Sequence, residues 1–272
     1  MPKTARTPMK IALCSIAFRE RLLEYALDLA ADVGFQGVEI WGREPHISQE
    51  FDANRVAAVR RMGAERGLEV PVFGSYLRLG ATNANQGGDV SLKDVLQTAA
   101  ALGSPIIRVW ASDVGSAEAD EATWRSTVRE VREAAASVAK MEMVLAAEMH
   151  SNTLADTGKS ARRLLEEVDS EGFALNFQPS SRPEEESAME RLEAVLPAVV
   201  HVHAQNYAPL GERRGGRVER VALADGLVDY ASLVRRLRKA DYQGYLAVEF
   251  SPSGVKDKAA AIARDFEYLS SL

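Results

Sequence analysis

The sequence predicts an α/β protein that folds as a single (β/α)8 barrel. Strand-like and helix-like segments alternate along the whole chain, and 272 residues suit one such barrel. Eight short apolar segments indicate buried strands, which span 9–15, 37–41, 69–75, 105–111, 143–149, 173–178, 199–204 and 245–250. Eight longer amphipathic segments indicate helices, which span 19–34, 50–67, 91–102, 119–140, 158–169, 185–195, 228–240 and 256–271. Such alternation requires parallel strands with right-handed crossovers, and eight units favour closure.

Glycines support these boundaries and also argue against the main competing fold. They stand between a helix and the next strand, where a left-handed cap or a tight turn is expected, at Gly34, Gly67, Gly103, Gly172 and Gly244. An open doubly wound sheet usually carries a glycine-rich phosphate loop after its first strand. Here the first strand leads into 15–19, which contains no glycine. The closed barrel is therefore the better prediction.

Composition and charge restrict the class of protein. The chain is 46% hydrophobic and 26% charged, as expected for a globular protein. Its net charge of −6 disfavours nucleic acid as a partner. It has no apolar run of about 18 residues, so we expect no membrane partner. The single cysteine, Cys14, fits a reducing, cytoplasmic location. We expect residues 1–8 to form a flexible tail before a barrel domain at 9–272. Monomer and homo-oligomer both stay open.

Polar residues gather on one face of several predicted strands, near their C-terminal ends. Side chains alternate between the two faces of a strand, and one face carries Glu39, Arg108, Glu148, His150, Asn176, Gln178, His201, His203, Gln205 and Glu249. Barrel enzymes place their chemistry at this end. A core built only for stability would not collect so many ionisable groups, because burying them is costly. We therefore expect a functional polar site at the mouth of the barrel.

Four of these side chains lie on four consecutive strands, so their ends can converge on one point. Two carboxylates, an imidazole and an amide oxygen form an oxygen-rich ligand set that suits Mn²⁺, Mg²⁺ or Co²⁺, with Zn²⁺ as a further option. The predicted ligands of this divalent metal ion are Glu148, Gln178, His203 and Glu249.

Several motifs resemble those of the xylose-isomerase-like TIM barrel superfamily, and they extend over nearly the whole chain. They are GFQGVEIW at 34–41, EMH at 148–150, TLADT at 153–157, HVH at 201–203, GLVDY at 226–230 and YQGYLAVE at 242–249. This superfamily contains sugar isomerases and epimerases, dehydratases and endonuclease IV. The motifs are specific for the superfamily and do not identify the reaction.

The resemblance implies the same metal site and shows one departure from it. The superfamily uses Glu, Asp, His and Glu on strands 5 to 8, where this chain has Glu148, Gln178, His203 and Glu249. Where related chains often read NFDPSH, this one reads NFQPSS at 176–181. A glutamine oxygen can still bind a hard cation, but the ligand set loses one negative charge. Gln178 is then a metal ligand, a substrate contact, or the mark of a degraded site.

The resemblance also implies a reaction and a set of substrate contacts. It implies a metal-dependent isomerase or epimerase acting on a sugar or polyol derivative, in which Glu148 and Glu249 bind metal and also serve as base and acid. We expect substrate contacts from His46, Arg108, His150 and Arg214, with Arg217 as a competitor and an ion pair to Glu39 as the alternative for Arg108.

Three other functions remain open on the sequence alone. A lyase or dehydratase on the same barrel needs the same proton abstraction. A sugar-binding homologue with an altered metal site would bind ligand without turnover. An enzyme resembling endonuclease IV is disfavoured by the negative charge and by too few His and Asp residues for its metal cluster.

Overall fold

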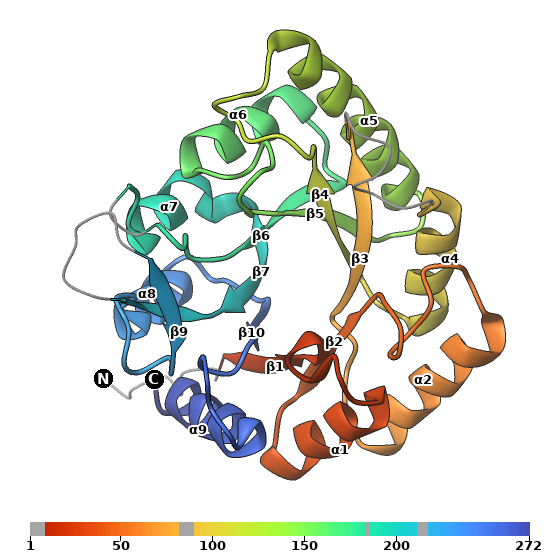
Figure 1. Ribbon diagram of the computed structural model, residues 1–272. Coiled ribbons are helices and arrows are strands. Elements are labelled where there is room, and N and C mark those ends of the chain that lie inside the picture. The colour runs from red at the N-terminus through yellow and green to blue at the C-terminus, as the bar shows by residue number, and fades with distance from the viewer. Residues whose placement is uncertain (1–8, 82–89, 183–184, 211–216) are drawn as a thin grey trace, which may run out of the picture.

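The computed structural model describes residues 9–81, 90–182, 185–210 and 217–272, and it confirms the predicted barrel. The barrel strands are β1 (Lys10–Cys14), β2 (Gly37–Trp41), β3 (Val72–Leu79), β4 (Ile106–Ala111), β5 (Val144–Glu148), β6 (Phe173–Phe177), β7 (Val199–Ala204) and β10 (Tyr245–Val248). They pair in parallel and close in the order β1-β10-β7-β6-β5-β4-β3-β2. Figure 1 shows helices forming a ring around these strands.

The helices follow the strands as predicted and begin at polar caps. They are α1 (Leu23–Val33), α2 (Ala53–Glu65), α4 (Leu92–Leu102), α5 (Glu121–Ala139), α6 (Gly158–Val168), α7 (Ala188–Val195), α8 (Tyr230–Lys239) and α9 (Lys258–Ser271), with 3-10 turns η1 (Ser15–Phe18) and η2 (Leu196–Ala198). Thr157 and Ser187 form capping boxes at α6 and α7. Gly34 ends α1 with φ 100°, a conformation that favours glycine. Within the described ranges, no helix is both long and apolar enough to cross a bilayer.

The alternation along the strands separates an apolar layer from a polar one. The outward residues of the strands pack against the helices in the main core, as Val38, Ile107 and Leu145 do. Inside the barrel, Ala12, Tyr245 and Ala247 form a small apolar cluster at the N-terminal end of the strands. The polar side chains therefore lie above this floor, toward the C-terminal end.

The third strand departs from its predicted bounds of 69–75. Only an isolated bridge joins Glu69 to Gly37, and Pro71 has no N–H to donate to a ladder. The strand instead spans Val72–Leu79, and its pairing with β4 shifts register between Gly74 and Arg78. This irregularity breaks the alternation of side chains, so the sequence pattern ended the strand too early.

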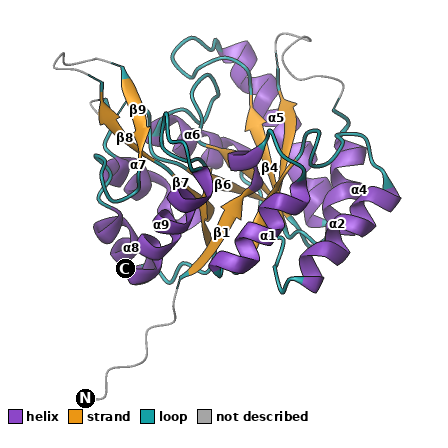
Figure 2. Ribbon diagram, turned by 60° about the horizontal axis from the view of Figure 1, so that its bottom comes forward, coloured by secondary structure: helices purple, strands orange, loops and turns teal. Residues whose placement is uncertain are grey.

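A hairpin replaces the long loop predicted at 205–224. Strands β8 (Asn206–Pro209) and β9 (Val218–Val221) pair antiparallel with each other and form a separate sheet. Figure 2 shows this hairpin above the barrel, on the side toward which the strand arrows point. It therefore stands beside the end of the barrel where the polar residues gather.

Candidate active site

The polar residues that share a strand face are buried together inside the barrel. Strand pairing places Glu148 beside Asn176, and Asn176 beside His201. The residues with less than a tenth of their surface exposed are Glu39, Arg108, Glu148, Asn176, Gln178, His201, His203, Gln205 and Glu249. The predicted side-chain parity is therefore what the structure shows.

Glu148, His203 and Glu249 form a carboxylate–imidazole group. One ligand atom from each lies within 4.8 Å of the others. His203 Nδ1 is 3.5 Å from Glu249 Oε1 and 3.8 Å from Glu148 Oε1. Within the described chain, Glu249 Oε2 is buried without a hydrogen-bond partner. Two carboxylates and a nitrogen at this spacing, with one oxygen unsatisfied, fit a divalent cation.

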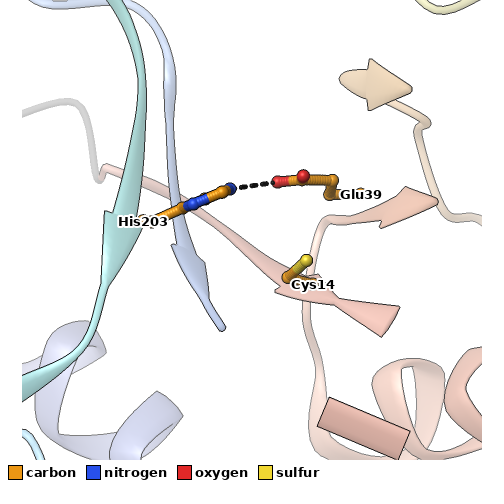
Figure 3. A group of neighbouring side chains, drawn as sticks. All are labelled: Cys14, Glu39 and His203. Carbon is orange, nitrogen blue, oxygen red and sulfur yellow. Dashed lines mark hydrogen bonds and ion pairs between the residues drawn. The ribbon is translucent and has the colours of Figure 1, made fainter. Parts of the chain in front are cut away.

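A second carboxylate holds His203 from below. Figure 3 shows Glu39 and His203 pointing toward each other across the barrel, with Cys14 nearby. Glu39 Oε2 lies 2.8 Å from Nε2 of His203 and 2.9 Å from Nε2 of His201. An N–H on Nε2 satisfies the carboxylate and leaves the Nδ1 lone pair of His203 toward Glu148 and Glu249. Glu39 therefore selects the His203 tautomer that a metal ligand needs.

The surrounding charges set the ionisation of this layer. Burial raises the pKa of Glu39, but the His203 and His201 side chains outweigh it and hold that pKa well below its usual range. Burial lowers the pKa of His201, so this imidazole is neutral. Burial also raises the pKa of the Cys14 thiol, which keeps it protonated. Gly74 makes room here, since a Cβ would lie 2.8 Å from Glu39 Oε1.

The two carboxylates of the group lie in different environments. Glu148 Oε2 accepts from Trp110 Nε1 at 2.7 Å and lies 3.4 Å from Arg108 Nε. Burial raises the pKa of Glu148, but Arg108 and His203 lower it to about 2. Burial and the Glu148 and Glu39 charges raise the pKa of Glu249 to about 7, against the opposing effect of His203. Glu148 is thus a fixed anion and Glu249 the more basic carboxylate.

The group opens into a large cavity at the C-terminal end of the barrel. Its volume is about 1130 Å³, and Glu148, Gln178 and Glu249 lie in its wall. Tyr76 and Trp110 form an aromatic side of the wall, with ring centroids 5.0 Å apart in an edge-to-face contact. Aromatic faces beside polar groups suit a polyhydroxylated small molecule.

Comparison with known proteins places this geometry in a family. Residues 27–272 match the family described as xylose isomerase-like TIM barrel. The chain belongs to this family. A 3-dehydroshikimate dehydratase from Bacillus anthracis is 25% identical over 276 residues, covering 92% of this chain and 93% of that protein.

Solved structures of the xylose isomerase-like family share the fold. A family protein from Mycobacterium smegmatis in complex with magnesium has a TM-score of 0.74 at 18% identity, covering 97% of this chain and 96% of that chain. A 3-keto-D-glucoside 4-epimerase from E. coli has a TM-score of 0.72 at 20% identity, covering 97% and 100%. The similarity thus extends over whole chains and includes a lyase and an epimerase.

Gln178, which replaces the Asp of the xylose isomerase-like pattern, is held by a relay of side chains. Its Oε1 accepts from Gln205 Nε2 at 2.8 Å, and Gln205 Oε1 accepts from Arg220 Nε at 3.1 Å. Because a guanidinium only donates, Gln205 must turn its oxygen to Arg220 and its amide nitrogen to Gln178. The Gln178 oxygen keeps one lone pair for another partner, so metal ligation and substrate contact both remain compatible with this geometry.

The predicted substrate contacts take different positions. His150 and Arg108 line the cavity. The ion-pair partner of Arg108 is Glu148 and not Glu39, as the alternative had it. His46 is fully buried, and its ring nitrogens contact Ser15 Oγ and the carbonyls of Phe18 and Arg21, so the structure does not bring it to the cavity. Arg214 lies outside the described residues.

The cavity also contains residues that the sequence did not single out. Trp110 shares a strand face with Arg108, so parity could have found it. Tyr76 follows the irregularity in β3, where parity fails. Arg220 lies on the unpredicted β9. Arg191 on α7 is buried and donates to the carbonyls of Met149, Asp156 and Gln178, which fixes the ends of β5 and β6; no periodic signal distinguishes it from a surface arginine.

Proposed function

We propose that the protein is a divalent-metal-dependent isomerase or epimerase of a sugar or polyol derivative, which removes a proton next to a carbonyl. The observation that carries this proposal is the convergence of Glu148, His203 and Glu249 within 4.8 Å, beside a cavity large enough for a monosaccharide. Glu148, His203 and Glu249 would hold the cation, with Gln178 as the proposed fourth ligand. Mn²⁺, Mg²⁺ and Co²⁺ suit these atoms best.

The cation, when bound, would polarise the substrate carbonyl and stabilise the negative charge that proton removal creates. The chain supplies the proton transfers. Glu249 Oε2 has no protein partner in the described part of the chain, so it is free to take or return a proton. Glu148 is unsuited to this role, because Trp110 and Arg108 occupy its Oε2.

His150 is the second candidate for proton transfer. Its Nδ1 lies 2.7 Å from the carbonyl oxygen of Ser151, so Nδ1 carries the proton and Nε2 the lone pair in the neutral ring. The ring is half-buried beside Trp110, at 5.6 Å between centroids, and lines the cavity. Two such groups are what an epimerase needs to remove a proton from one side and return it on another.

A dehydratase is the second candidate function. Its support is the similarity to a 3-dehydroshikimate dehydratase over nine-tenths of both chains. Both reactions begin with the same proton abstraction. The two reactions diverge after that abstraction, because a dehydratase must protonate a departing hydroxyl and leave a double bond.

Proton exchange with solvent tests the step that both functions share. Apo protein reloaded with Mn²⁺ would be incubated in D₂O with D-fructose, a 3-keto-glucoside and 3-dehydroshikimate. We expect deuterium at the carbon next to the carbonyl by NMR, and loss of exchange after chelation or in Glu249→Gln. A new epimer or isomer supports the first function, and an α,β-unsaturated chromophore the second. Substrate binding without any exchange would overturn both and leave a non-catalytic sugar-binding homologue.

A further inference from the structure

Arg220 is built into the cavity wall by contacts on both its backbone and its side chain. Its backbone N–H donates to Ser253 Oγ at 3.2 Å, and its carbonyl accepts from Ser253 N–H at 2.8 Å. Its Nε donates to Gln205 Oε1 at 3.1 Å, and Gln205 is itself buried. The guanidinium is therefore positioned before any ligand arrives, which lowers the entropy cost of binding.

Aromatic packing orients the same guanidinium. Its central carbon lies 4.0 Å from the ring centroid of Phe250 and 5.9 Å from that of Tyr207, and all three residues line the cavity. Stacking uses a face of the guanidinium, and the bond to Gln205 uses one of its five N–H groups. The four N–H groups on Nη1 and Nη2 have the forked geometry that binds carboxylate and phosphate.

Arg220 also lacks the carboxylate partner that other arginines of the cavity have. Arg108 pairs with Glu148, Arg191 with Glu186 and Arg182 with Glu185. Among the residues that the structure describes, no carboxylate lies within 4.0 Å of a nitrogen of Arg220. A fixed cation without a counterion in a substrate cavity is arranged for an anion that comes with the ligand.

We propose that Arg220 recognises an anionic group of the substrate, so the substrate class is a carboxylate- or phosphate-bearing sugar or polyol derivative. This inference rests on the proposed function, since it names the substrate of the same cavity. Arg220 thus takes the role that the sequence suggested for Arg214 or Arg217. The relay through Gln205 to Gln178 sets the position of this charge relative to the carboxylate–imidazole group.

Binding of matched ligand pairs tests this proposal without requiring turnover. The pairs are shikimate with its methyl ester, and D-fructose 6-phosphate with D-fructose, titrated into Mn²⁺-loaded protein by calorimetry. A charge-assisted arginine contact predicts about 10- to 100-fold tighter binding of one anionic member. The pair that shows this preference distinguishes a carboxylate from a phosphate.

Substitutions assign the preference to one residue. Arg220→Gln should abolish it, Arg220→Lys should keep part of it, and Arg236→Gln, an exposed arginine paired with Glu193 on the outside of the barrel, should leave it unchanged. The proposal fails if wild-type protein does not prefer either anion, or if Arg217→Gln rather than Arg220→Gln removes the preference. Anion-selective binding without proton exchange would leave this proposal standing and overturn the proposed function alone.

Discussion

Replacing Glu39 by glutamine tests how the layer below the site supports the cation. Glu39 Oε2 lies 2.8 Å and 2.9 Å from the Nε2 atoms of His203 and His201, and it is fully buried. A charged acceptor makes hydrogen bonds about twice as strong as a neutral one, which is a difference of about 1 kcal/mol for each bond. Only the bond to His203 acts on the metal-binding nitrogen. We therefore expect Glu39→Gln to bind Mn²⁺ about tenfold more weakly, at the lower end of the usual effect of such partners.

The assay is a competition between apo protein and a fluorescent chelator for Mn²⁺ at pH 7.5. Glu69→Gln is the matched control, because it removes the same charge near the opposite end of the strands, where Glu69 accepts from Tyr245 Oη. Circular dichroism would confirm that both variants are folded. Unchanged affinity in folded Glu39→Gln would refute the reasoning, and so would an equal loss in Glu69→Gln, which would indicate net charge alone. Imidazole ¹⁵N spectra with Mg²⁺ bound should show the proton of His203 on Nε2.

Three further substitutions test the remaining parts of the site and fold. Gln178→Asp adds a third carboxylate and should tighten Mn²⁺ binding by about tenfold or more; equal affinities would mean that residue 178 does not reach the cation. Arg191→Met leaves three buried carbonyls and Glu186 without their donor, and should lower the free energy of unfolding by about 3–5 kcal/mol in urea titrations, whereas a loss below 1 kcal/mol would contradict this. Burial raises the pKa of Asp265 to about 6, so its stabilising protonated form is lost as pH rises through that value. Asp265→Asn should therefore be about 1–2 kcal/mol more stable than wild type at pH 8 and equal to it at pH 4; a constant difference would exclude the linkage.

The sequence was sufficient wherever a regular strand carried the side chain. Glu148, His203 and Glu249 lie on uninterrupted strands or directly after one, so alternation predicted that they face the interior. Parity cannot distinguish a ligand from its support, and Glu39 shows this, because it shares the interior face but binds His203.

Prediction failed where the backbone leaves regular geometry. His46 follows β2 in a loop, and only tertiary contacts with Ser15, Phe18 and Arg21 determine that it is turned into the core. Tyr76 follows a shift of register, and Arg220 lies on a hairpin whose strands are four residues long. Short strands carry too few residues for a periodic pattern to emerge.

The separate sheet formed by β8 and β9 has an evolutionary consequence. The hairpin pairs with no barrel strand, so its residues can change without altering the register that positions Glu148, His203 and Glu249. A lineage could lengthen, recharge or delete this appendage and so acquire new substrates while it inherits the same proton-transfer chemistry. Grafting the hairpin of one relative onto another is then a direct route to transplanting substrate preference.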